Sequence, residues 1–347
     1  MKSTFRTTAP GEAAEVAAFL CRSFEIPPTL PLVQPNQLRW KYWDERPDWP
    51  GARGYALARE DGYLAHGAVV PLVCLSGGRR LRMVHLIDWA ADPRSVGSGV
   101  MLLRGVARLV DAMLVVGGSD ITRKVLPALG ARSCGTVTRF ARPLHPLKRL
   151  SGQKPTWRAG AQVARSLLWW WTAPRRRTSG WRAERVPPED LASRALPWPR
   201  ASSAITLFER TPESIAYLCR CPTARVEVFA ASRAGTVRGY FILSHVPGQV
   251  RIVDFYADTE DPESWRAVLH LAIAEAKRNR DAAEVAAFGS DRVTRAALTD
   301  CGFHPRGDIE VRLLSVTGVP LPDEPIRVQM LESDAAYLHA NRKDYWA

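Results

Sequence analysis

The stretch VHLIDWAADPRSVGSGVMLLRGVARLVDAMLVVGG, residues 84–118, decides the fold of this chain. Its first part is an apolar run of β-forming residues that ends at Asp92 and Pro93, and residues 100–113 then carry apolar side chains at helical spacing. A second short apolar run occupies residues 113–116. The stretch therefore predicts a strand, a loop, a helix and a second strand.

The loop between the predicted strand and helix contains Arg94, Gly97 and Gly99 in the order R-x-x-G-x-G. Glycine adopts positive φ and lets the backbone approach a ligand closely. We therefore expect the N–H groups of residues 96–100 to point in one direction at the start of the helix, where the helix dipole favours an anion. This pattern predicts a phosphate-binding loop; a plain strand-to-helix turn that needs glycine for its geometry is the alternative. The dinucleotide motif G-x-G-x-x-G is absent.

Three predicted strands precede the loop, at residues 55–58, 63–70 and 82–90, and glycine-containing turns join them. This order of elements and the R-x-x-G-x-G loop resemble the GNAT acyltransferase family, in which the loop binds the pyrophosphate of acetyl-CoA. The resemblance covers residues 1–144 and, more faintly, 200–316. It implies an α/β fold with a mixed sheet of the α+β kind, built as two tandem GNAT-like acyl-CoA N-acyltransferase domains that use acetyl-CoA or another acyl-CoA as co-substrate.

The resemblance also implies a co-substrate site at the end of the central strand and in the loop. Its predicted members are Trp89, Ala90, Ala91, Arg94, Val96, Gly97, Ser98 and Gly99. Backbone N–H groups near residues 89–91 would meet the oxyanion of the reaction. The aromatic residues Trp40, Tyr42 and Trp43 are expected to shape the acceptor pocket or, alternatively, to cover a core.

GNAT chemistry needs a base, because an amine of pKa about 10.4 is mostly protonated near neutral pH. The predicted catalytic candidates on the central strand are His85 and Asp88, with His66 on the preceding strand; a structural role, or for Asp88 orientation of the acceptor, is the alternative. Many GNAT enzymes protonate the leaving thiolate with a Tyr on the helix after the fifth strand, but residues 117–131 contain none. Ser119 is the predicted substitute, and unassisted departure or loss of activity are the alternatives.

A repeat indicates that the chain is duplicated. Residues 118–131 read GSDITRKVLPALGA and residues 289–303 read GSDRVTRAALTDCGF, although chance similarity of so short a motif is the alternative. The loop of the second copy, ADTEDPE at residues 257–263, has four acidic residues and no glycine, so it would repel a pyrophosphate. One active and one degenerate copy resemble the double-GNAT architecture of FemABX-type peptidyl transferases.

A length of 347 residues also favours two domains. The predicted divisions are an acyl-CoA-binding GNAT-like domain at residues 1–150, a basic linker helix rich in Trp and Arg at 151–184, a degenerate GNAT-like domain at 185–318, and a C-terminal tail at 319–347.

The positive charge of the chain is concentrated around the linker. Residues 121–183 contain fourteen Lys and Arg and no Asp or Glu, which accounts for the net charge of +13. Within them, residues 155–177 read PTWRAGAQVARSLLWWWTAPRRR, the composition of an interfacial helix whose Trp rings lie at lipid headgroups and whose cations meet anionic lipid. A helix that buries its aromatic residues between the domains is one alternative, and RNA binding without a recognisable module is another.

Other features narrow the class of protein. The six cysteines lack metal-ligand spacing, so no metal site is predicted, and neither a signal peptide nor a run of about 20 apolar residues is visible. We expect a cytoplasmic protein, with peripheral contact at the inner face of the membrane through residues 155–177, and we expect no nucleic-acid partner.

The predicted function is transfer of an acyl group from CoA to an amine acceptor. An amino sugar or another cell-surface polysaccharide precursor is the predicted acceptor, since residues 328–338, VQMLESDAAYL, resemble the tails of GNAT-like proteins of surface polysaccharide biosynthesis. A non-catalytic tandem GNAT-like scaffold or membrane-docking protein is the alternative.

Overall fold

The structure is a computed structural model that describes residues 3–150, 157–174, 179–202, 204–315 and 317–340. In the first half of the chain the strands are β1 (Thr4–Thr7), β2 (Gly54–Arg59), β3 (Gly62–Ser76), β4 (Arg79–Ala91), β5 (Ala112–Val116) and β6 (Arg132–Pro143). The helices of this half are α1 (Ala13–Phe24), α2 (Pro35–Leu38), the π-helix η3 (Arg39–Trp43), α3 (Ser98–Ala107), α4 (Asp120–Ala128) and α5 (Trp157–Thr172). Short 3-10 turns are η1 (Pro10–Glu12), η2 (Pro31–Val33) and η4 (Pro146–Leu150).

The second half repeats this order of elements. Its strands are β7 (Trp181–Val186), β8 (Leu207–Phe208), β9 (Arg225–Arg233), β10 (Thr236–Val246), β11 (Gln249–Ala257), β12 (Glu284–Gly289) and β13 (His304–Leu314). Its helices and turns are η5 (Pro188–Asp190), α6 (Pro212–Cys219), α7 (Pro262–Ala276), α8 (Arg292–Asp300), η6 (Met330–Glu332) and η7 (Asp334–Ala336). The mixed α/β fold predicted from the sequence is confirmed, and the predicted strand, loop, helix and strand of residues 84–118 are β4, the loop, α3 and β5.

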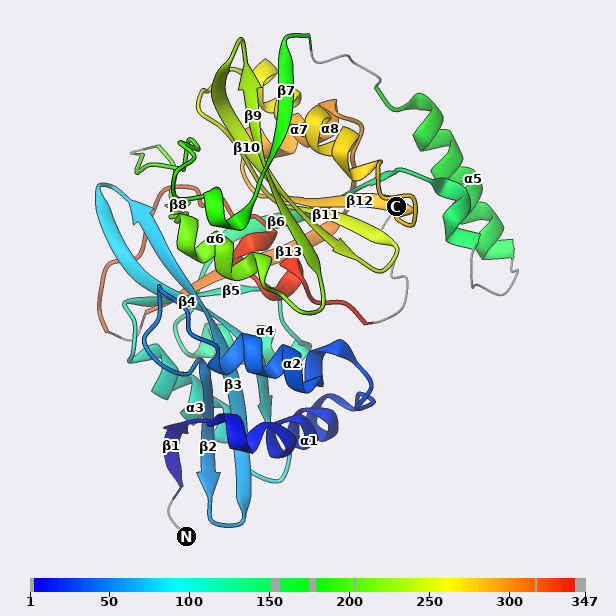
Figure 1. The fold of residues 1–347 in the computed structure, drawn as a ribbon. Helices are drawn as coiled ribbons and strands as arrows, with labels where there is room; N and C mark the ends of the chain where they lie inside the picture. The colour runs from blue at the N-terminus through cyan, green and yellow to red at the C-terminus, as the bar shows by residue number, and fades with distance from the viewer. Residues whose placement is uncertain (1–2, 151–156, 175–178, 203, 316, 341–347) are drawn as a thin grey trace.

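The strands form one large sheet in which the two halves exchange their last strands (Figure 1). The order along the described sheet is β1-β2-β3-β4-β5-β13-β6-β12-β11-β10-β9-β7, with β8 paired to β3. Strand β13 therefore pairs with β5 of the first half, while β6 pairs with β12 of the second half. We call β1–β5 with α1–α4 the first unit, and β7–β12 with α6–α8 the second unit. The boundary predicted at residue 150 stays a prediction, and hydrogen bonds of the sheet cross it.

The largest hydrophobic core joins the two units. It contains Leu20 and Ile87 from the first unit, Phe208 and Tyr217 from the second, and Val328 from the C-terminal tail. A separate cluster lies under α3 and another under α7, each on the other face of its own part of the sheet. Because burying apolar area is the main favourable term in folding, this shared core ties the units and the tail together.

Candidate active site

Strand β4 carries a bulge at the centre of the first unit. Ala68 pairs with Ile87 and His66 pairs with Ala90, so two residues, Asp88 and Trp89, stand opposite the single Gly67. Asp88 has a φ of 50°, which is uncommon outside glycine. Such bulges redirect side chains and main-chain groups and gather near active sites.

Strands β4 and β5 diverge just before this bulge. Their parallel pairing ends at His85 and Leu114. Beyond that point β4 continues to Ala91, while Val115 and Val116 of β5 keep only their pairing with β13, on the other edge of β5. The main chain around Trp89 therefore has no neighbouring strand on the β5 side, and within the described residues no side chain forms a hydrogen bond with the main chain of Trp89.

The glycine loop follows at the start of α3 and is exposed. Gly97 is the N-cap residue of α3 with a φ of 83°, and a Cβ at this position would meet no atom within 4 Å. The first amides of a helix, here those of Gly99 and Val100, have no acceptor within the helix. The side chain of Arg94 is 89% exposed and pairs with Asp92 at 2.7 Å. These residues fit an anionic ligand, because open amides and a cation meet at a helix N-terminus.

Two predicted members of the co-substrate site, Ser98 and Trp89, form hydrogen bonds within the protein. The amide of Ser98 donates to the carbonyl oxygen of Ser95 at 3.1 Å, and its hydroxyl donates to the carbonyl oxygen of Leu64 at 3.0 Å. The series of parallel N–H groups expected over residues 96–100 is therefore interrupted at Ser98, which shapes the loop from inside. The indole of Trp89 donates to the carbonyl oxygen of Gly99 at 3.0 Å and so ties the end of β4 to the first turn of α3. The side chain of Val96 is fully exposed.

His85 lies on β4 as a buried, neutral imidazole. Its Nδ1 is 3.0 Å from the carbonyl oxygen of Leu114, which can only accept, so Nδ1 carries the proton and Nε2 keeps a lone pair. Burial lowers the pKa of His85 below its ordinary value, despite the opposing charges of Asp334 and Asp88. The ring is therefore deprotonated at neutral pH, as a base must be.

Asp88 is held by residues of the π-helix η3. Its carboxylate forms a buried ion pair with the ammonium of Lys41 and accepts a hydrogen bond from the Tyr42 hydroxyl at 2.6 Å. A carboxylate with two strong partners is better suited to orienting groups than to taking a proton. His66, on the neighbouring strand, is completely buried, and burial lowers its pKa to about 4.

The C-terminal tail also reaches this site. Burial and the charge of Asp88 raise the pKa of Asp334, and the charges of His85 and Lys41 act in the opposite direction. The Tyr337 ring packs edge-on against Trp40 at 4.8 Å between centroids, and Trp40 stacks on Tyr217 of the second unit. The tail was not among the predicted site residues.

Ser119 caps the helix α4. Its Oγ accepts from the amide of Thr122 at 3.2 Å and lies 3.1 Å from the Thr122 hydroxyl. A serine that accepts at an N-cap keeps its own proton to donate. The predicted role of Ser119 as acid for the leaving thiolate stays a prediction.

Comparison with known proteins gives matches only at the level of structure. No family model and no curated protein sequence matches the chain. Among solved structures, a GCN5-related N-acetyltransferase from Anabaena variabilis has 12% identity and a TM-score of 0.57, covering 90% of this chain and 72% of its own. A probable N-acyltransferase from Enterococcus faecalis has 13% identity and a TM-score of 0.58, covering 92% and 74%. The N-myristoyltransferase of Saccharomyces cerevisiae with bound myristoyl-CoA has 11% identity and a TM-score of 0.60, covering 95% and 83%.

This chain has the GNAT fold. The likeness extends over both units, so the tandem GNAT-like arrangement predicted from the sequence is confirmed.

The second GNAT unit has its own carboxylate at the position of the glycine loop. Asp261 caps α7, the counterpart of α3, and accepts from the amides of Glu263 at 3.1 Å and Ser264 at 3.2 Å. These backbone hydrogen bonds lower the pKa of Asp261. The helix N-terminus that is open at Gly97 is therefore already occupied by an anion of the chain in the second unit.

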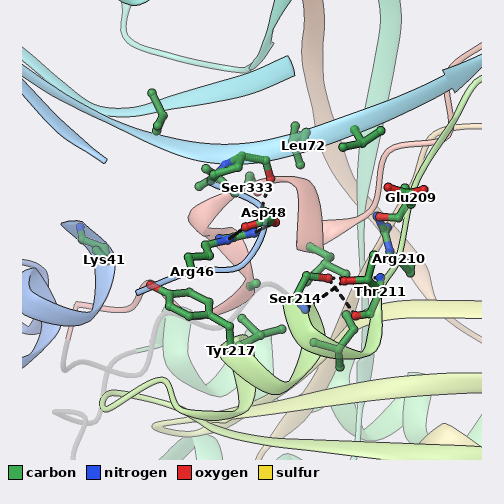
Figure 2. A pocket seen from close by; sticks show the side chains of 18 of the residues that line it. Lys41, Arg46, Asp48, Leu72, Glu209, Arg210, Thr211, Ser214, Tyr217 and Ser333 are labelled. Carbon is green, nitrogen blue, oxygen red and sulfur yellow. Dashed lines mark hydrogen bonds and ion pairs between the residues drawn. The ribbon is translucent and has the colours of Figure 1, made fainter. Parts of the chain in front are cut away.

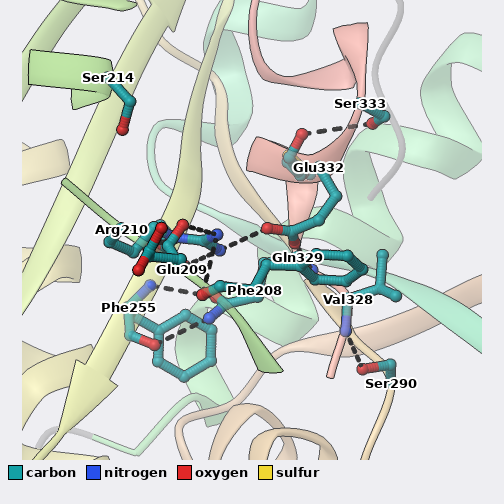
Figure 3. Close-up of polar contacts among 12 residues, drawn as sticks. Phe208, Glu209, Arg210, Ser214, Phe255, Ser290, Val328, Gln329, Glu332 and Ser333 are labelled. Carbon is teal, nitrogen blue, oxygen red and sulfur yellow. Dashed lines mark hydrogen bonds and ion pairs between the residues drawn. The ribbon is translucent and has the colours of Figure 1, made fainter. Parts of the chain in front are cut away.

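The divergence of strands in the second GNAT unit is filled by the tail (Figure 3). Strands β11 and β12 stop pairing at Ile252 and Ala287. The side-chain amide of Gln329 then bonds to β11: Oε1 accepts from the amide of Phe255 at 3.0 Å, and Nε2 donates to the Phe255 carbonyl oxygen at 2.9 Å. The next residues anchor the tail, since Glu332 pairs with the buried Arg210.

A second repeat, which the sequence analysis did not detect, shows that the bulge region of β4 and the corresponding part of β11 are equivalent. Residues 87–92 read IDWAAD and residues 253–258 read VDFYAD, which aligns Trp89 with Phe255 and Asp88 with Asp254. The pairing agrees, because His66 stands opposite Ala90 as Tyr240 stands opposite Tyr256. Asp254 is also held by a cation and a tyrosine: Arg210 at 2.7 Å and Tyr240 at 2.8 Å.

A narrow pocket lies between the two GNAT units and the tail (Figure 2). It has a volume of about 70 Å³ and is bounded by β3, by Ile87 beside the bulge, by α6, and by tail residues from Leu331 to Tyr337. Its polar lining includes the Arg46–Asp48 ion pair, with Nε and Oδ1 2.6 Å apart, and the hydroxyl of Ser214. Trp40 lines this pocket, and the Tyr42 hydroxyl donates to Asp88. Both residues also belong to the shared hydrophobic core, so their predicted role in shaping an acceptor pocket stays a prediction.

Metal ligation has no support among the residues described. No group of three or more His, Cys, Asp or Glu side chains in that part of the chain is placed to hold a metal ion.

Proposed function

We propose that the first unit transfers an acyl group from an acyl-CoA to an amine. The observation that carries this proposal is the contrast between the two units. In the second unit the chain itself supplies a carboxylate at the helix N-terminus and a carboxamide at the diverging strands, through Asp261 and Gln329. In the first unit the equivalent positions, Gly97 and the main chain of Trp89, have no such internal partner within the described residues.

The chemistry of these internal partners matches the parts of coenzyme A. An anion at a helix N-terminus corresponds to its diphosphate, and an amide beside the strand corresponds to an amide of its pantetheine arm. We therefore assign one acyl-CoA to each chain, with Arg94 and the amides of Gly97, Gly99 and Val100 at the phosphates. The structural relatives support this assignment, because one of them carries myristoyl-CoA.

The residues around the β4 bulge supply the remaining roles. When bound, the acyl-CoA provides the thioester carbonyl. The main-chain amides at the bulge stabilise charge on its oxygen, and Nε2 of His85, directly or through water, accepts the proton of the attacking amine. Asp88, fixed by Lys41 and Tyr42, orients the amine, and Ser119 donates a proton to the leaving thiolate.

The acceptor enters through the pocket between the units, and within this proposal it is an amino sugar or another cell-surface polysaccharide precursor. The pocket accommodates only a small group, which suits the amine-bearing end of a larger molecule. Its hydroxyl groups and the Arg46–Asp48 pair suit a hydroxylated acceptor better than an aliphatic one.

A non-catalytic scaffold is the second candidate, and two observations favour it. Oδ2 of Asp88 is engaged by both Lys41 and Tyr42. Moreover, α4 carries no tyrosine to protonate the thiolate.

Calorimetric titration with acetyl-CoA tests the proposal, using Gly97→Glu and the matched variant Gly235→Glu. Both glycines have positive φ, near 80°, and no atom within 4 Å of a Cβ, so both substitutions have a similar structural cost. We expect one site per chain in the parent and in Gly235→Glu, and at least tenfold weaker binding in Gly97→Glu, where a carboxylate meets the phosphates. Absence of binding, or equal binding by both variants, would refute the proposal. Binding without release of free thiol across a panel of amino sugars would favour the scaffold.

A further inference from the structure

We propose that helix α5 docks this protein onto an anionic lipid surface through the side chains that it turns away from the sheet. The proposal is independent of the acyl-transfer activity. It rests on the orientation of α5, on the exposure of its apolar side chains and on the charge of the surrounding chain.

Helix α5 packs on the body of the protein with only one of its faces. Val163 and Ser166 of the helix are buried, and so is Ala173 directly after it. Trp169 stacks on His304 of β13 with ring centroids 3.9 Å apart, and the guanidinium of Arg165 lies over the same ring at 4.9 Å. This face fixes the helix, and Figure 1 shows α5 on the outside of the fold.

The opposite face is apolar and exposed. Ala164, Leu167, Leu168 and Trp171 follow one another at the i, i+3, i+4, i+7 spacing of a single helical stripe. Leu168 is 57% exposed and Trp171 is 72% exposed, and the neighbouring Trp170 is 39% exposed. The alternative in which the aromatic residues are buried between the two units is therefore wrong for Trp171, whereas Trp169 stacks on His304 and Trp170 is only partly exposed.

The charge of this region selects the partner. Residues 121–183 contain fourteen basic residues and no acidic one. Acidic residues outside this segment pair with Arg123, Arg132, Lys148 and Arg149, and the segment as a whole favours anions. Tryptophan and leucine beside cations suit the boundary between headgroups and acyl chains of an anionic bilayer. Nucleic acid would satisfy the cations but would leave the leucines in water. No described helix is both long and apolar enough to cross a membrane, so the contact would be peripheral.

The predicted segment 155–177 extends beyond α5 into residues 155, 156 and 175–177, which lie outside the described residues. The docking surface is therefore defined here by Leu167, Leu168 and Trp171 alone.

Flotation of the full chain with vesicles tests the proposal. Vesicles of phosphatidylcholine with about 30% phosphatidylglycerol should carry the parent protein upward, and neutral phosphatidylcholine vesicles should carry much less. The Leu168→Ser/Trp171→Ser variant should lose at least tenfold in partition coefficient. The matched control is Ile121→Ser, since Ile121 on α4 is also 72% exposed. Its partition should equal that of the parent, and circular dichroism melting should show that all variants are folded.

Three outcomes would overturn the proposal. The first is equal flotation of the double variant and the parent, and the second is no flotation of the parent on anionic vesicles. The third is a parent protein that does not bind vesicles but binds single-stranded RNA. A parent protein that does not bind vesicles but forms a dimer in gel filtration, which the double variant dissociates, belongs to the same outcome.

Discussion

At the scale of single residues, the site depends on how burial sets protonation. His85 on β4 and His66 on β3 are both buried, and burial lowers the pKa of both. Nδ1 of His85 has a carbonyl partner that fixes the tautomer of the ring, which leaves Nε2 basic. In the proposed mechanism His85 takes the proton-transfer role, whereas His66 packs beside Tyr42.

Replacing His85 with Gln should lower kcat by about 10²- to 10⁴-fold, the usual contribution of a positioned base. Because the pKa of His85 lies below 6.5, the parent should lose kcat only as the pH falls below that value. The Gln variant should lack this acid limb. A pH profile of kcat from 4.5 to 8.5 is the measurement, with His339→Gln as control, since His339 lies in the tail and bonds to Thr223. An unchanged acid limb in His85→Gln would contradict the assignment.

His66 should make folding stability depend on pH. Its pKa is about 4 when folded and near 6.5 when unfolded, so between these values only the unfolded chain binds the proton. Stability should therefore fall as the pH drops from 6.5 towards 4, by about 3 kcal/mol from this group. Urea unfolding at several pH values should give a flatter dependence for His66→Phe than for the parent. Parallel curves for the two proteins would contradict the prediction, whatever their absolute stabilities.

At the scale of elements, two parallel strands diverge in each unit, and the divergence is open in the first unit and filled in the second. Strands β4 and β5 separate beside an open main chain at Trp89, whereas β11 and β12 separate around Gln329. The tail segment that supplies Gln329 then continues to Tyr337 at the pocket between the units. The tail therefore fills the divergence of β11 and β12 in the second unit and also lines the pocket between the two units.

Replacing Gln329 with Ala should loosen this element. The amide and carbonyl groups of Phe255 would lose their partners in a buried place, which costs roughly 3 kcal/mol of unfolding free energy. We expect KM for the acceptor to rise severalfold while the Kd for acetyl-CoA is unchanged. The control is Asp323→Ala in the exposed part of the tail, where the side chain is 87% exposed and pairs with Arg132. Unchanged stability and KM would show that the tail is not held by Gln329.

At the scale of the whole molecule, the exchange of β6 and β13 makes the two units interdependent. Without the second half of the chain, β5 keeps β4 on one side and has a free edge on the other, and β6 loses both of its neighbours, β13 and β12. Unpaired strand edges in a hydrophobic sheet promote aggregation. The shared core with Leu20, Phe208 and Val328 adds to this dependence.

Fragments of residues 1–174 and 175–347 should therefore not fold separately. Each should lack a cooperative thermal transition by circular dichroism, and refolding them together should restore one. A monomeric, cooperatively melting fragment 1–174 would contradict the prediction. The intact chain, refolded under the same conditions, is the control.

The sequence by itself determined the local architecture of this protein. The signals for the strand, the loop and α3 lie close together in the sequence, so local rules predict these elements. They are Asp92 and Pro93, the glycines of the loop and the apolar spacing of α3. The acidic loop of the second unit was predicted for the same reason, although the capping role of Asp261 was not. The repeated GSD motif correctly indicated two similar units.

Only the tertiary structure decided which residues surround the groups of the candidate site. Lys41 and Asp88, or Gln329 and Phe255, are far apart in the sequence, and no periodicity links one member of such a pair to the other. The local sequence likewise does not predict the exchange of β6 and β13, because the pattern of each strand is compatible with pairing in either unit. Contacts of this kind follow from how the apolar faces of both units and of the tail bury one another, which is a property of the whole chain.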